Sequence, residues 1–153
     1  MINYKEKFMK IALKEAKKAY DNGEVPIGAV LVLDGKVIAK GRNKCNELGN
    51  AIAHAEIVAI NKASKKLNDW RLENVEMYVT LEPCSMCAGA IANSRIKKVY
   101  FGAYERKSGA VLSNFHVLFS TGLNHQVDVE GGICLEECSL LLKKFFKNKR
   151  EEN

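Results

Sequence analysis

The sequence predicts an α/β domain in three layers, with a mixed five-stranded sheet between helices on both faces. The chain opens with apolar residues at helical spacing. A predicted two-stranded hairpin follows, and predicted strands then alternate with helices. The chain has 153 residues, enough for one substantial core, and no composition break or low-complexity linker divides it. We therefore predict a single domain over residues 1–153.

The first half of the chain is predicted to form a helix, a hairpin and a second helix. Apolar residues recur at helical spacing from Phe8 to Ala19, and Asn22-Gly23 is typical of a helix end. Asp34-Gly35 is a two-residue turn signal between two runs rich in aliphatic and β-branched residues, which indicates a hairpin. In order, we predict a helix up to residue 21, strands at 27–33 and 37–41, and a helix at 53–65.

The second half alternates strands with helices and ends in a long helix. After Gly131-Gly132, apolar residues recur at helical spacing, and Cys134 and Cys138 are predicted to share one face as small core residues. We expect catalytic residues at the strand-to-helix junctions, where backbone N–H groups converge. In order, we predict strands at 76–81, 97–101 and 126–129, helices at 85–93 and 114–119, and the final helix.

Composition and charge narrow the class of protein. The hydrophobic content of 47% and the charged content of 27% are ordinary for a globular domain. Five cysteines, an odd number, do not suggest a disulfide framework, and the first residues lack a signal-peptide core. The apolar stretches are too short for a membrane span. We expect a cytoplasmic protein with no membrane partner, and the net charge of +6 permits a polyanionic one.

One group of residues has the side chains and the spacing of a metal site. His54, Cys84 and Cys87 offer one imidazole and two thiols, which are ligands that Zn²⁺ prefers, and Glu56 lies two residues after the histidine. A Cys-x-x-Cys pair alone fits a redox pair, half of a structural zinc site, or chance. A structural site would need a fourth protein ligand, and the other cysteines and histidines lack paired spacing. Three ligands with a nearby carboxylate favour a catalytic zinc site.

The mechanism of such a site sets geometric conditions on these residues. Zinc lowers the pKa of a bound water, and Glu56 is the natural carrier of the released proton. Helical positions two apart point in nearly opposite directions, so His54 must lie at the very start of its helix for both side chains to reach one site. We predict that Pro83 starts the next helix and that Cys84 and Cys87 share one of its faces.

These residues and several longer segments resemble the zinc-dependent nucleoside and base deaminases, and more closely the bacterial tRNA adenosine deaminases. The resemblance covers nearly the whole chain and is most specific at residues 78–90, which include Glu82-Pro83-Cys84. The other matching segments are 23–30, 53–56, 70–72, 94–96, 124–125, 136–138 and 145–146.

The resemblance implies a cytidine-deaminase-like fold and a hydrolytic reaction. Adenosine at the wobble position (34) of an arginine tRNA would become inosine, through attack of zinc-activated hydroxide on C6. Glu56 would protonate N1 and then the departing ammonia. The family implies one zinc ion per subunit, no dinucleotide cofactor, and a homodimer in which the tRNA anticodon loop touches both subunits.

The resemblance also assigns residues to the substrate. Glu82 is implied to support the site without entering the chemistry. The loop at residues 102–113 lines the nucleotide pocket in the family, and this chain departs there from the family pattern. It has Glu105 where aspartate is common and Leu112 where glycine is common. The expected substrate contacts are Asn43, Ala55, Glu105, Phe146, Lys149 and Arg150.

Two other functions compete with this prediction. One is a small-molecule deaminase that acts on guanine, cytosine or a nucleoside with the same zinc chemistry. The basic residues near the C-terminus favour RNA over that alternative, although a charged helix face is commonly only solvated. The other is an RNA-binding or scaffold module with a purely structural zinc, which would have no use for Glu56.

Overall fold

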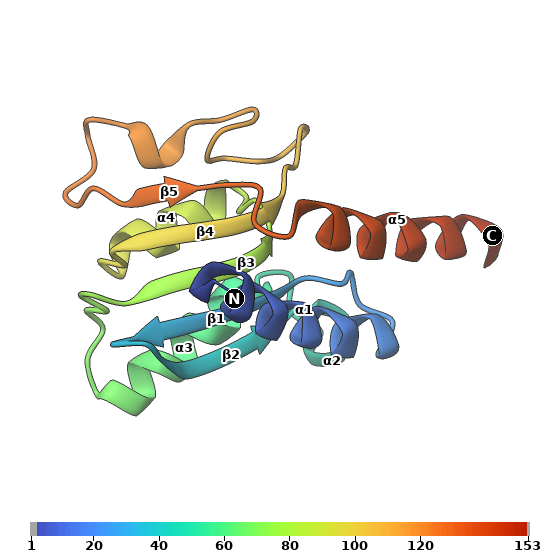
Figure 1. Ribbon diagram of the computed structural model, residues 1–153, viewed down its shortest axis with the longest axis horizontal. Coiled ribbons are helices and arrows are strands. Elements are labelled where there is room, and N and C mark those ends of the chain that lie inside the picture. The colour runs from blue at the N-terminus through green and yellow to red at the C-terminus, as the bar shows by residue number, and fades with distance from the viewer. Residues whose placement is uncertain (1–2, 153) are drawn as a thin grey trace.

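The sheet is mixed, and its strand order differs from the order along the chain. The computed structural model describes residues 3–152. The strand order is β2-β1-β3-β4-β5, with β1 antiparallel to β2 and β3, and with β3, β4 and β5 parallel (Figure 1). The strands are β1 (Gly28–Leu33), β2 (Lys36–Arg42), β3 (Glu76–Leu81), β4 (Lys98–Ala103) and β5 (Asp128–Glu130).

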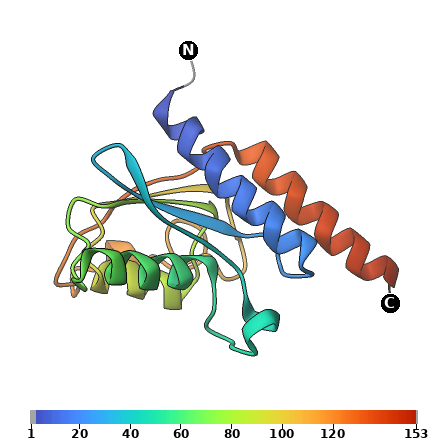
Figure 2. The same cartoon turned by 90° about the horizontal axis from the view of Figure 1, so that it is seen from below.

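Helices cover both faces of the sheet, as predicted. In Figure 2, α1 and α5 lie side by side on one face, and α3 and α4 lie on the other. In residues 3–152, no helix has the length and apolar character needed to cross a membrane. The helices are α1 (Tyr4–Asp21), α2 (Cys45–Leu48), α3 (Ala55–Leu67), α4 (Ser85–Asn93), α5 (Leu135–Glu152) and a 3₁₀ helix (Val117–Phe119).

The sheet divides the core into two layers, as neighbouring residues of β1 show. Alternate residues of a strand point to opposite faces of the sheet. Leu31 is buried in the layer that contains α3 and α4, whereas Val30 is buried in the layer beneath α1. On the α1 side, the rings of Tyr78 and Tyr100 stack with centroids 4.4 Å apart. The site therefore rests on strands that are packed on both faces.

Two glycines in the hairpin allow helices to approach the sheet closely. A Cβ atom on Gly28 would lie 2.6 Å from the amide nitrogen of Ala16 in α1. A Cβ atom on Gly41 would collide with the carbonyl of Ala55 and lie 2.7 Å from the amide nitrogen of Ala59, both in α3. Gly41 thus determines how close the first turn of α3 lies to β2.

Most predicted elements are confirmed, and the differences are local. The hairpin turn at Asp34 and Gly35 has φ angles of 51° and 77°, as a two-residue turn requires. Helix α2 was not predicted, and the helix expected at 114–119 is reduced to a 3₁₀ turn. Two placements were wrong: Pro83 lies two residues before α4, and Cys134 lies just outside α5. Cys134 nevertheless packs against the same core layer as the buried Cys138.

Candidate active site

Three potential metal ligands meet where two helices begin. His54 is the N-cap residue of α3, Cys84 is the N-cap residue of α4, and Cys87 lies in the first turn of α4. The Nδ1 atom of His54 is 3.7 Å from the Cys84 sulfur and 3.5 Å from the Cys87 sulfur. The three ligand atoms all lie within 4.8 Å of one another. The expected juxtaposition of these residues is therefore present.

The backbone at both caps explains how the ligands converge. His54 and Cys84 have extended ψ angles of 154° and 176°, so each side chain leaves the chain before its helix begins. In the described part of the chain, the His54 side chain makes no capping hydrogen bond to α3. The amide of Ala55 donates instead to the Oδ1 atom of Asn43, at 2.9 Å. Because His54 lies outside the helix, Glu56 can approach the same site from the first turn of α3.

Glu56 lies in an environment that favours its neutral form. Its side chain is buried, with 4% of the residue exposed. Burial raises its pKa to about 7, and the neighbouring Cys84 thiolate adds to this shift. An acid–base group works best with a pKa near the working pH, so this carboxyl group is suited to accepting and releasing a proton near neutrality.

The two thiols differ in their tendency to ionise. A hydrogen bond from Cys87 lowers the pKa of Cys84 to about 4, and His54 contributes in the same direction. The same bond with Cys84, together with burial, raises the pKa of Cys87. The bond with Cys84 also raises the pKa of His54. The negative charge of the pair is therefore concentrated on the Cys84 sulfur.

The donor set fits a zinc ion. One imidazole nitrogen and two sulfurs are the nitrogen and sulfur ligands that zinc favours, and three protein ligands are typical of catalytic sites. Two thiolates would neutralise a divalent cation, which reduces the cost of partial burial. His54 would bind through Nδ1, because that atom faces both sulfurs.

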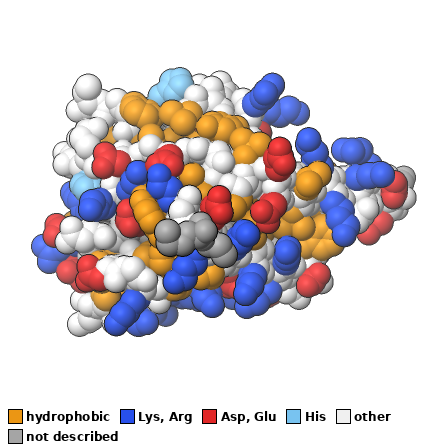
Figure 3. Space-filling model, viewed as in Figure 1, with side chains coloured by type: hydrophobic (Ala, Val, Ile, Leu, Met, Phe, Trp, Pro, Cys, Tyr) orange, Lys and Arg blue, Asp and Glu red, His pale blue; other side chains and the backbone are white. Residues whose placement is uncertain are grey.

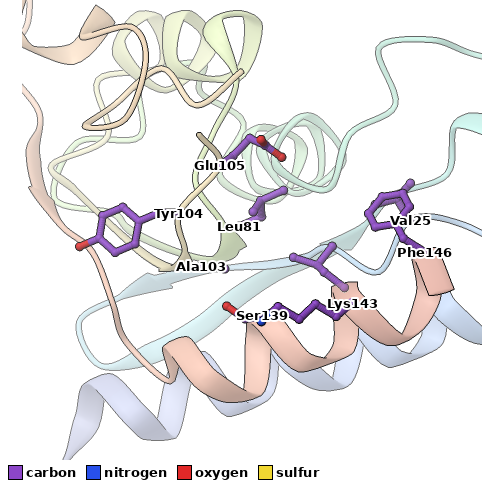
Figure 4. Close-up of a pocket in the computed structure, with 9 residues that line it drawn as sticks. Val25, Leu81, Ala103, Tyr104, Glu105, Ser139, Lys143 and Phe146 are labelled. Carbon is purple, nitrogen blue, oxygen red and sulfur yellow. The ribbon is translucent and has the colours of Figure 1, made fainter. Parts of the chain in front are cut away.

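A pocket of about 270 Å³ lies between α5 and the ends of β3 and β4. Two of the expected substrate residues, Glu105 and Phe146, line it together with Val25 and Leu81. Figure 4 shows Ser139 and other side chains of α5 facing Leu81 and Glu105 across this pocket. The pocket is separate from the cluster, which lies on the α3 and α4 side of the sheet.

The other expected substrate residues divide into two groups. Asn43 and Ala55 are buried, and Ala55 directly follows His54. The amide of Ala55 donates to Oδ1 of Asn43, and this bond leaves the side-chain NH₂ group of Asn43 available to a ligand. Lys149 and Arg150 are exposed in the last turns of α5. In Figure 3, Lys and Arg side chains surround apolar ones on this protruding end. Phe146 is 44% exposed, whereas Phe145 is buried.

Two buried carboxylates organise the loops around the site. Glu24 accepts bonds from the amides of Asn46 and Glu47, at 3.1 Å and 2.8 Å, and so fixes the start of α2. Glu82 accepts bonds from the loop that follows β4, which is consistent with the supporting role expected of it. Although burial opposes its ionisation, hydrogen bonds from Ser113 and neighbouring amides hold the pKa of Glu82 below its usual value.

Known proteins resemble this chain over most of its length. A family profile described as MafB19-like deaminase matches residues 3–150. The tRNA-specific adenosine deaminase of Bacillus subtilis (strain 168) is 48% identical over 147 residues, which are 96% of this chain and 91% of that protein. A solved tRNA:A34 deaminase, studied for A-to-I editing at the wobble position of transfer RNA, aligns with a TM-score of 0.87 and 46% identity. That match covers 89% of this chain and 99% of the other.

A second similar protein of known structure is named for a different substrate. A guanine deaminase from Bacillus subtilis aligns with a TM-score of 0.63 and 40% identity, over 67% of this chain and 66% of that chain. The three-layer fold and the histidine–cysteine cluster define a deaminase with the cytidine-deaminase-like α/β fold. Within that class, the chain belongs to the family of bacterial tRNA-specific adenosine deaminases. The family predicted from the sequence is confirmed.

Proposed function

We propose that the chain hydrolyses adenosine to inosine and ammonia at the wobble position (34) of a tRNA, with an arginine tRNA as the substrate. The observation that carries this proposal is the buried Glu56 carboxyl group beside three potential zinc ligands at the meeting ends of α3 and α4. The name of the Bacillus subtilis relative and the studied wobble editing of the solved neighbour support the choice of substrate.

The proposed reaction needs a polarised water and a proton carrier. His54, Cys84 and Cys87 would hold the zinc ion, which when bound would supply the Lewis acidity that lowers the pKa of water. Glu56 accepts the proton lost by the water that attacks C6 of adenine. It delivers this proton to N1, and it later carries the proton of the new C6 hydroxyl group to the amino group, which leaves as ammonia. Burial of Glu56 holds its pKa near 7, which suits both directions of transfer.

The surface beyond the cluster favours RNA over a free nucleoside. The pocket lined by Glu105 and Phe146 lies between α5 and the ends of β3 and β4, and the exposed Lys149 and Arg150 lie farther along α5. Anticodon-loop bases are unpaired and can stack on aromatic rings, while phosphates bind basic side chains. We assign Phe146 to base stacking and Lys149 and Arg150 to phosphate binding, and we assign Asn43, Ala55 and Glu105 to the flipped nucleotide.

We further propose that the enzyme is a cytoplasmic homodimer with one zinc ion per subunit. Leu112, Phe115 and Phe119 are exposed apolar residues in one segment after β4, and a second subunit would cover such a surface. Light scattering at several protein concentrations would give the mass of a dimer, and metal analysis would give one zinc per chain. A monomer at all concentrations would contradict the proposed assembly.

The decisive experiment offers the purified protein an RNA and several small substrates. An anticodon stem-loop with adenosine at position 34 is compared with free adenosine, cytidine and guanine, and inosine or ammonia is measured. We expect product from the stem-loop alone, and more from an arginine tRNA than from a tRNA whose wobble base is guanosine. Deamination of guanine or of a nucleoside alone would overturn the RNA proposal in favour of a small-molecule deaminase.

Glu56→Gln tests the proton carrier. Loss of a general acid–base group costs about 10²- to 10⁴-fold in rate, and we expect zinc content and thermal stability to remain near those of the wild type. Glu15→Gln is the matched control, because Glu15 is a second buried glutamate but lies in α1, where it pairs with Lys18. Wild-type turnover by Glu56→Gln would remove this residue from the mechanism and favour a structural metal site.

A further inference from the structure

The carboxylate of Glu82 is surrounded by hydrogen-bond donors from one loop. The residue follows β3 directly and is only 2% exposed. One oxygen accepts from the amide of Glu105 at 3.1 Å and from the Ser113 hydroxyl. The other accepts from the amides of Val111, Leu112 and Ser113, at 3.1 Å, 2.7 Å and 2.8 Å. The loop at residues 104–113 is therefore folded around a single side chain.

The loop also packs closely against Glu82 and the residue that follows it. A Cβ atom on Gly109 would lie 2.6 Å from the Oε1 atom of Glu82, so the carboxylate occupies the space that a larger residue would need. The amide of Ala110 donates to the carbonyl of Pro83 at 2.8 Å. Glu82 and Pro83 immediately precede Cys84, so the same short segment holds the loop and ends in a cluster residue.

Glu82 connects the 104–113 loop to the segment that ends in Cys84. The amide of Glu105 donates to Glu82, and the side chain of Glu105 lines the pocket under α5. The amide of Ala110 ties the same loop to Pro83, the residue before Cys84. We propose that Glu82 is a positioning residue: it fixes the backbone of the 104–113 loop and thereby sets the affinity for the nucleotide that enters the site. This inference rests on the proposed function for the identity of the substrate. The loop geometry on which it depends is independent of the substrate.

Glu82→Gln tests this inference with minimal change of shape. The variant replaces one acceptor oxygen with an NH₂ group that faces backbone N–H donors, so some of the five bonds must be lost. Glu76→Gln is the matched control, because Glu76 begins the same strand at its opposite end and accepts a bond from Tyr100 at 3.2 Å. Hydrogen exchange is measured for the amides of residues 105 and 111–113, together with KM, kcat and zinc content.

We expect the Glu82→Gln amides at these positions to exchange at least about tenfold faster, since bonds to charged acceptors are among the stronger ones. KM for the stem-loop should rise about tenfold, while kcat stays within about threefold of the wild type and zinc remains bound. Glu76→Gln should match the wild type in all four measurements. If Glu82→Gln does not fold, Ser113→Ala removes one donor only and should show the same changes at smaller size.

The outcomes separate this inference from the proposed function. Unchanged exchange and unchanged KM in Glu82→Gln would overturn the inference, as would loss of zinc together with kcat, which would place the role of Glu82 at Cys84 instead of the loop. Wild-type protein that does not deaminate the stem-loop would overturn the proposed function. The exchange measurement would still decide whether Glu82 holds the loop.

Discussion

Gly41→Ala should destabilise the protein and impair the site at the same time. The added Cβ atom would collide with the Ala55 carbonyl and lie 2.7 Å from the amide nitrogen of Ala59, where ordinary contacts begin at 3.4 Å. The first turns of α3 must therefore retreat by at least about 0.7 Å, because both neighbours are backbone atoms that cannot rotate away. Overpacking of this kind costs about 1–3 kcal/mol, which corresponds to a fall in Tm of about 3–10 °C.

The same displacement carries Glu56 with it. A misplacement of about 1 Å can cost about a hundredfold in rate, so we expect kcat of Gly41→Ala to fall at least about tenfold. Thermal melts and single-turnover deamination of the stem-loop measure the two effects. Gly89→Ala is the control: it lies within α4, and among residues 3–152 no heavy atom beyond its chain neighbours and the backbone of its own helix comes within 4 Å of its added Cβ. Alanine there should stabilise the helix by about 1 kcal/mol. Wild-type Tm and rate in Gly41→Ala would refute the close-contact argument.

Three further changes have equally specific outcomes. Cys84→Ala should abolish zinc binding and deamination together, as metal analysis would show; a variant that keeps its zinc would exclude this sulfur as a ligand. Phe146→Ala should raise KM for the stem-loop about 5- to 150-fold and leave kcat unchanged, since stacking contributes about 1–3 kcal/mol per base; an unchanged KM would argue against stacking. Hydrogen bonds from Lys5 and Lys98 lower the pKa of Glu130, so its contribution to stability is present at neutral pH and disappears as pH falls through that pKa. Melts of Glu130→Gln should therefore differ from wild type at pH 7 and converge with it as the pH falls below the lowered pKa of Glu130.

The fold could be predicted where local chemistry determines it. The Asp34-Gly35 turn and the alternation of strands and helices are visible in the sequence because turn residues and apolar periodicity act over a few residues. Helix α2 was missed because its first amides bond to Glu24, 22 and 23 residues away. The strand order depends in the same way on contacts between distant segments, which no local pattern reveals.

The site was predictable to the extent that its chemistry requires particular side chains. His54, Cys84 and Cys87 stand out because few residue types bind zinc, and Glu56 follows from the need for a proton carrier. The environment of Glu82 could not be predicted, because its donors lie 23–31 residues away and four of the five are main-chain amides. An amide is present at every residue except proline, so it leaves no trace in the sequence.

That dependence on main-chain donors bears on how such an enzyme can acquire new substrates. The amides that hold the loop remain when side chains change, so the exposed Arg106 and Lys107 can vary without altering the course of the backbone. The backbone of the loop can therefore be kept while the side chains that it presents to a substrate change. In a directed-evolution experiment, these exposed positions should accept mutations freely, whereas Glu82 and Gly109 should return as invariant in every selected variant.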